Sequence, residues 1–117
     1  MKHSMTLYEE AFDLIRSGEK RIEVRCNDEK RKKIKINDEI IFYELHEEKQ
    51  WFIVKVQDLY ECKTFEELYS MFDLSEFGRA EYSVKDMVEG IREIYPIEKE
   101  KTYGALGIRI ELISFEQ

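Results

Sequence analysis

One short segment constrains the fold of this chain more than any other. Residues 20–25 alternate in charge and hydrophobicity with the period of a β-strand, in which successive side chains lie on opposite faces. Lys20 therefore shares a face with the apolar Ile22 and Val24, whereas Glu23 lies with two arginines on the other face. A charge that points into a core must be paired or used. The segment predicts either an edge strand with solvated charges or a strand that presents a polar site.

Length and composition predict one globular domain over residues 1–117. Hydrophobic residues make up 43% of the chain, enough for a core and too many for a disordered segment. The longest apolar runs, at 39–43 and 51–54, have the length of strands and are too short to cross a bilayer. The sequence starts without an apolar signal segment, so we expect a cytoplasmic protein that makes no membrane contact.

The cysteines and histidines do not predict a metal centre. Cys26 and Cys62 suit a reducing compartment and need not be paired. The chain has two histidines and lacks the CxxC and HxxxH spacings of zinc sites. We therefore expect neither a bound metal nor another cofactor.

Charge is distributed unevenly along the chain. The net charge of −7 argues against non-specific binding of nucleic acid by the whole surface. Eight of the 19 basic residues nevertheless lie between positions 20 and 35, and 16 of the 26 acidic residues follow position 44. The run Lys30, Arg31, Lys32 and Lys33 is either a phosphate-binding patch or a solvated loop.

Hydrophobic periodicity predicts a helix followed by strands in the first half of the chain. A capping box at Thr6–Glu9 and apolar residues at helical spacing predict a helix through Arg16. After the charged strand, we expect strands at 40–44 and 51–60, with neighbouring strands antiparallel.

The second half of the chain predicts two helices and a closing strand. Capping boxes at 64–67 and 83–86 open helices that run through Met71 and Ile94. The last strand is expected at 103–113, where Gly104 and Gly107 indicate a bulge, a barrel corner or the close approach of a ligand. The strands are expected to close into a barrel, which protects short edges.

The charged strand and its flanks resemble the ASCH domain family. Gly18, Lys20, Glu23 and Arg25 match the family signature Gly-x-Lys-x-x-Glu-x-Arg without a gap. Residues 27–38 resemble the DEKR…I…GD stretch that follows it, with asparagine at position 37 where the family has glycine. Residues 95–108 are similar to the closing helix and strand of the family, so the resemblance covers nearly the whole chain.

This resemblance implies an α+β fold of the PUA-like type: a small mixed β-barrel flanked by helices, with a cleft beside the signature strand. The family is associated with RNA through its kinship with PUA domains of RNA modification. Some small members are amidohydrolases that deacylate N4-acetylcytidine, with a lysine at the place of Lys20 as nucleophile or activator. Those enzymes have threonine where this chain has Glu23, and a separate glutamate for which Glu76 and Glu81 are the candidates.

The candidate site combines the signature with the closing strand. We hypothesise that Lys20, Glu23, Arg25 and Tyr103 border one polar cleft, with Lys20 and Glu23 as the candidate catalytic groups. Strict alternation places Lys20 and Glu23 on opposite faces, so a shared site requires a bulge or a twist. The pair of Glu23 and Arg25 is alternatively a structural ion pair that fixes the barrel.

Two classes of function follow. The first is a binding module for RNA or a nucleotide, with Arg25 and Tyr103 in the cleft and residues 30–33 on the phosphates. The second is a hydrolase that acts on a modified nucleoside, like the N4-acetylcytidine amidohydrolases, or on RNA as a ribonuclease. The binding function ranks first because it does not depend on a threonine at position 23.

Overall fold

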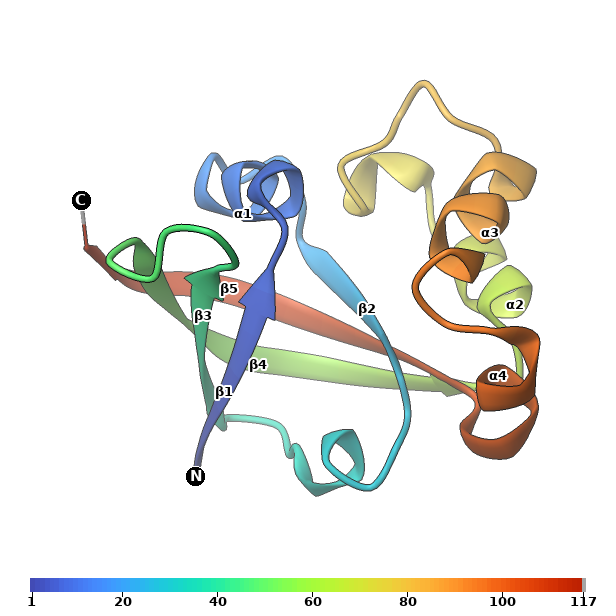
Figure 1. Ribbon diagram of the computed structural model, residues 1–117, viewed down its shortest axis with the longest axis horizontal. Coiled ribbons are helices and arrows are strands. Elements are labelled where there is room, and N and C mark those ends of the chain that lie inside the picture. Colours follow the sequence, from blue (N-terminus) through green and yellow to red (C-terminus); the bar gives the residue numbers. More distant parts are fainter. Residues whose placement is uncertain (117) are drawn as a thin grey trace.

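The computed structural model describes residues 1–116, which form one five-stranded mixed sheet with helices around it (Figure 1). Gln117, the last residue of the predicted domain, lies outside the described residues. The elements in chain order are β1 (Lys2–Leu7), α1 (Glu9–Arg16), β2 (Ile22–Cys26), η1 (Arg31–Lys33), β3 (Glu39–Glu44), β4 (Trp51–Cys62), α2 (Phe65–Ser70), η2 (Leu74–Glu76), α3 (Val84–Arg92), α4 (Ile97–Tyr103) and β5 (Ala105–Glu116).

The sheet has the strand order β1-β3-β4-β5-β2, and only the pairing of β1 with β3 is parallel. It curls into a half-barrel, with α1 over one end and α2, α3 and α4 grouped beside β2 (Figure 1). The α+β fold with flanking helices is therefore confirmed. The barrel is not closed by strand pairing, because β1 and β2 are the two edges of the described sheet.

Side chains bridge the gap between these two edges. The carbonyls of Met1 and Leu7 face β3, so those of Ser4 and Thr6 point to the free edge of β1. Arg25 Nη2 donates to Thr6 O at 2.8 Å, and Lys30 Nζ donates to Ser4 O at 2.9 Å. Two basic side chains thus satisfy backbone acceptors that a neighbouring strand would otherwise satisfy.

Two apolar clusters lie on either side of the curled sheet. One is centred on Phe12, Phe42 and Phe52 and packs α1 against the strands. The other packs α2 and α3 onto β2 and β5. Gly107 allows this second contact, because a Cβ there would lie 2.9 Å from Leu68 Cδ1 of α2. The sequence suggested a bulge, a barrel corner or a ligand at this glycine, and the structure places a helix against it instead.

The N-terminal capping box was predicted wrongly. Residues 2–7 form β1, Thr6 lies within that strand, and α1 starts after Tyr8, which caps the helix with no side-chain hydrogen bond in the described chain. The side chains of Met5 and Leu7 are buried and those of Ser4 and Thr6 exposed, which is the period of a strand. This alternation was overlooked because Leu7 also fits the apolar spacing of the helix that follows.

The other helix starts agree with the sequence. Thr64 accepts a hydrogen bond from Glu67 N, and Ser83 forms a complete capping box with Asp86. The helix α3 ends at Arg92, before the predicted Ile94. Tyr103 is the last residue of α4 and not the first of the closing strand, because the chain turns at Gly104 with φ +77°.

Within residues 1–116, each helix is too short or too polar to cross a bilayer.

Candidate functional site

A pocket of about 140 Å³ lies where the free edges of β1 and β2 meet α1 and α3. It contains Lys20, Glu23 and Arg25, the three charged residues of the signature. The remaining lining residues are Thr6, Leu7, Tyr8, Ala11, Val24, Tyr69, Ile91, Ile94 and Tyr95. The pocket thus combines three charged side chains with apolar and aromatic walls, which is the usual composition of a small-ligand site.

Lys20 and Glu23 meet because regular strand geometry does not extend back to Lys20. The strand β2 begins only at Ile22, and Lys20 instead forms an isolated bridge with Phe77. The Lys20 Nζ lies 2.8 Å from Glu23 Oε1. The irregularity that a shared site requires is therefore present in the chain just before β2.

Glu23 is the centre of the charged group. It is only 4% exposed, and its second oxygen accepts from Arg25 Nε at 2.7 Å. Burial by itself raises the pKa of this carboxyl, but the charges of Lys20 and Arg25 outweigh it and lower the pKa to about 2. The carboxylate is consequently ionised at neutral pH, and one negative charge lies between two positive ones.

The charge of Glu23 affects its neighbours as well. Burial lowers the pKa of Arg25, yet Glu23 and Tyr95 reverse this and raise it above its ordinary value. Burial raises the pKa of Tyr69, and the nearby Glu23 raises it further. Tyr69 therefore keeps its hydroxyl proton at neutral pH and can donate it in a hydrogen bond.

A wider groove of about 410 Å³ continues the pocket toward solvent and shares Lys20, Tyr69 and Ile91 with it. Arg79 lies in this groove over the ring of Tyr82, 5.4 Å from the ring centroid, and pairs with Glu10 at 2.8 Å. The groove therefore places an aromatic side chain and a cation next to the pocket.

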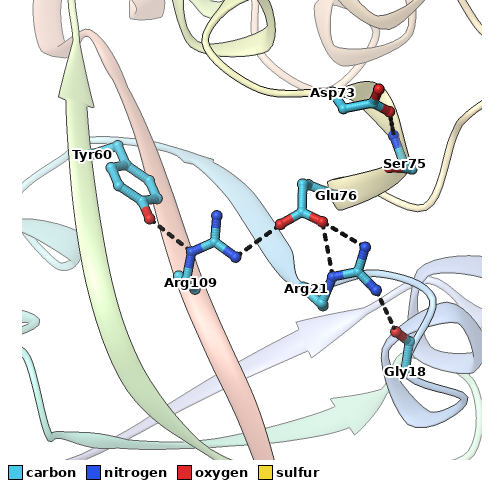
Figure 2. Close-up of polar contacts among 7 residues, drawn as sticks. All are labelled: Gly18, Arg21, Tyr60, Asp73, Ser75, Glu76 and Arg109. Atoms are coloured by element: carbon cyan, nitrogen blue, oxygen red, sulfur yellow. Dashed lines mark hydrogen bonds and ion pairs between the residues drawn. The ribbon is translucent and has the colours of Figure 1, made fainter.

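The two candidate glutamates lie outside the pocket. Glu76 accepts hydrogen bonds from both Arg21 and Arg109. Arg109 also donates to the Tyr60 hydroxyl at 2.7 Å (Figure 2). Hydrogen bonds from the two arginines lower the pKa of Glu76. Glu81 is exposed and lines a separate shallow pocket. Neither carboxylate lines the pocket that contains Lys20.

The Glu76 cluster instead holds the segment that covers Lys20. Arg21 N donates to Glu76 O at 2.9 Å, and the next residue, Phe77, is the bridge partner of Lys20. Gly78 follows at φ +76°, and a Cβ there would lie 3.2 Å from Lys20 Cβ. This clamp fixes one wall beside the lysine.

Tyr103 does not join the signature residues. Its side chain lines a different pocket, with Cys62 and Lys101, at the end of α4. The aromatic residues that line the signature pocket are Tyr8, Tyr69 and Tyr95. Sequence reasoning missed all three, and only the position of Tyr95 at the end of a helix gave any signal.

The basic run divides into two parts. The ammonium of Lys30 donates to β1, and Arg31 pairs with Asp28 at 2.8 Å. Lys32 and Lys33 are exposed. Lys30 is exposed too, but its ammonium is engaged by the Ser4 carbonyl. Over residues 1–116, His, Cys, Asp and Glu do not gather into a group of three that could hold a metal ion.

The fold and the site define an α+β protein of the PUA-like type with a polar pocket at the open edge of its half-barrel. The sequence profile of the ASCH domain matches residues 5–114. The chain belongs to the ASCH domain family. No curated protein matches the sequence.

Solved structures agree with this assignment. The hypothetical protein PH0355 is 36% identical over 97% of this chain and 100% of its own, with a TM-score of 0.86. Protein PF0455 from Pyrococcus furiosus is 31% identical over 97% and 98%, with a TM-score of 0.74. The ASCH protein from Zymomonas mobilis shares the fold at 17% identity, covering 92% of this chain and 65% of its own, with a TM-score of 0.64.

Proposed function

We propose that this ASCH domain binds RNA and takes one nucleotide into the pocket that contains Lys20, Glu23 and Arg25. The ASCH domain is generally thought to bind RNA, which supports the class of ligand. The observation that carries the proposal is the buried, ionised Glu23, held between Lys20 at 2.8 Å and Arg25 at 2.7 Å in a pocket with tyrosines on its walls.

This arrangement suits a planar, polar ligand. Glu23 fixes both cations, so their remaining N–H groups are oriented before a ligand arrives and lose little entropy on binding. The residual charge of the three groups is +1, which attracts a phosphate or a carbonyl oxygen. Tyrosine rings supply faces on which a base can stack. Such a protein would act in the cytoplasm, where the free thiols of Cys26 and Cys62 stay reduced.

One observation favours a hydrolase as the second candidate. The Lys20 amine and the Glu23 carboxylate line the same pocket, and a lysine beside a carboxylate is the minimal set for attack on an amide. Such an enzyme would use Lys20 on a modified nucleoside such as N4-acetylcytidine, or act on RNA. Attack requires a neutral amine, however, and Lys20 donates to a charged carboxylate. Binding without turnover is therefore the preferred function.

The test combines binding and turnover. Fluorescence anisotropy with a labelled single-stranded RNA should show binding that Lys20→Ala weakens about tenfold, the loss expected for a charge-assisted contact. Lys49→Ala, an exposed lysine between β3 and β4, is the matched control and should bind like wild type. Equal affinity of all three proteins would refute the proposal. Release of acetate from N4-acetylcytidine, or cleavage of the RNA, lost in Lys20→Ala, would establish the hydrolase instead.

A further inference from the structure

The pocket that contains Lys20 surrounds the free edge of β2. Glu23 and Arg25 line it from one face of this strand. Tyr69 and Tyr95 line it from the opposite face, where they pack in the apolar cluster that also holds the Val24 side chain. The other edge of β2 is occupied by β5, so the two faces meet in the pocket across the free edge. The main chain of β2 is therefore part of the pocket.

The hydrogen-bond register shows which main-chain groups point to this free edge. Arg21 O accepts from β5 at 3.0 Å, and Asn27 N donates at 3.1 Å to the residue that precedes β5. In an antiparallel pair, residues alternate between those that bond to the partner strand and those that point away from it. Glu23 and Arg25 therefore also bond to β5. The even-numbered residues of β2 direct their N–H and C=O groups to the free edge.

Val24 is the even-numbered residue that reaches the pocket. Ile22 and Cys26 are 0% exposed, whereas Val24 is 7% exposed and lines the pocket. No strand of the described sheet lies beside this edge of β2, and no turn, loop or cap residue within 1–116 bonds to the Val24 main chain. Both carboxylate oxygens of Glu23 are engaged by cations. A main-chain donor and acceptor in such a place pair with a ligand or with water.

The gap at this edge suits a small planar ligand better than an added strand. Arg25 crosses the gap, because it bonds both to Glu23 on β2 and to Thr6 O on β1. The pocket has a volume of about 140 Å³. A ring of the size of a nucleobase is the kind of group that can reach the Val24 main chain there.

We propose that the main chain of Val24 reads the hydrogen-bonding edge of the bound base. The inference rests on the proposed binding of RNA. Val24 O accepts from an N–H of the base, and Val24 N donates to the acceptor beside it, as with the N3–H and a carbonyl oxygen of uracil. Lys20 and Arg25 supply donors for a further oxygen of the ligand. Recognition therefore depends on an unmodified N–H at the edge of the base.

The first test is amide NMR of the full chain with UMP. In the free protein, the Val24 amide should exchange with solvent faster than the amides of Glu23 and Arg25, which bond to β5. Saturating UMP should shift the Val24 amide and slow its exchange at least about tenfold. In N3-methyl-UMP a methyl group replaces the N–H donor. This probe should bind about tenfold more weakly than UMP, because Val24 O stays unpaired.

The second test removes the donor from the protein. Cys26 allows a synthetic segment 1–25 to be ligated to residues 26–117, so that an ester oxygen replaces the Val24 N–H in the full chain. We expect this protein to bind UMP about tenfold more weakly. The matched control is the same replacement at Ile22, which lies on the same edge but outside the pocket. Each ester weakens one carbonyl that bonds to β5, so the two proteins should unfold alike.

The outcomes separate this inference from the proposed function. Shifts at Lys20 and Tyr95 without protection of the Val24 amide would overturn the inference and leave the proposed function standing. Equal UMP affinity of the two ester proteins, or N3-methyl-UMP bound as tightly as UMP, would assign the Val24 edge to water and overturn it too. Without any shift in the pocket the inference fails, and RNA anisotropy with Lys20→Ala still tests the proposed function by itself.

Discussion

The Lys20 ammonium lies 2.8 Å from the Glu23 carboxylate, although regular strand geometry would place residues three positions apart on opposite faces. The pair forms because β2 starts only at Ile22 and Lys20 is held by a bridge to Phe77. The consequence is a buried anion with two cations around it at the open edge of a half-barrel. Folding and the proposed ligand binding therefore depend on the same side chains.

The pH dependence of stability should report this anion. The pKa of Glu23 falls from 4.5 to about 2 on folding, because Lys20 and Arg25 outweigh the effect of burial. The unfolded chain therefore takes up this proton first, so the stabilisation is complete above about pH 5 and is lost as the pH falls toward 2. It amounts to about 3 kcal/mol. Urea unfolding of wild type and Glu23→Gln should differ most at pH 7, and the difference should shrink toward pH 2.

Glu39→Gln is the control for this titration, since Glu39 lies partly exposed at the start of β3 and pairs only loosely with Lys2 at 3.9 Å. Its stability should follow that of wild type at every pH. A Glu23→Gln protein as stable as wild type at pH 7 would contradict the proposed role of the ion pairs.

Arg25 should matter for the edge of the sheet as well as for the pocket. Its guanidinium joins Glu23 to the carbonyl of Thr6 on β1. Arg25→Met leaves a buried carboxylate with one counter-charge and a backbone acceptor without a donor, so we expect a loss of about 3 kcal/mol. Hydrogen exchange of the β1 amides should accelerate. The stability of Arg25→Lys should lie between those of wild type and Arg25→Met. Lysine keeps the charge, but it lacks the forked guanidinium that reaches both Glu23 and Thr6. Unchanged β1 protection in Arg25→Met would refute the bridging role.

Substitutions in the basic run should have two different effects, one on RNA binding and one on the stability of β1. Lys32 and Lys33 are exposed, so Lys32→Ala/Lys33→Ala should reduce the salt dependence of RNA binding without affecting the fold. Two lost phosphate contacts lower the slope of log K against log salt by about 1.4 for a single strand. Lys30→Ala should instead weaken β1, since its ammonium donates to Ser4 O. Anisotropy at several salt concentrations measures the slope, and an unchanged slope would assign Lys32 and Lys33 to a solvated loop.

Gly78 should be intolerant of a side chain. Its φ is +76°, and a Cβ would lie 3.2 Å from Lys20 Cβ, so Gly78→Ala combines backbone strain with a close contact. We expect a loss of about 1–2 kcal/mol and shifted NMR signals for the Lys20 side chain. Gly90→Ala is the matched control: it is inside α3, and apart from its chain neighbours and its own helix backbone, no atom of the described chain lies within 4 Å of its Cβ. That variant should gain about 0.5–1 kcal/mol. Equal stability of the two variants would contradict the constraint at Gly78.

The sequence by itself determined the fold class, the ASCH family and the approximate places of α1, α2, α3 and the strands β2 to β5, but not β1. Capping residues such as Ser83 act within one turn of helix, and the apolar alternation of β3 and β4 is local, so both can be recognised without coordinates. The charged signature was recognisable for the same reason. The ion pair between Lys20 and Glu23 was not recognisable, because strict alternation places these two residues on opposite faces.

Only the tertiary structure decided which residues share the pocket. Tyr69 comes from α2 and Tyr95 from the turn between α3 and α4, and packing over long sequence distances brings both to β2. Tyr103 is carried away by the turn at Gly104. Glu76 was recognisable as a carboxylate but not as the partner of Arg21 and Arg109, which come from separate segments. Local sequence encodes the period of an element and its ends. The meeting of distant side chains depends on how the elements pack, which no short segment specifies.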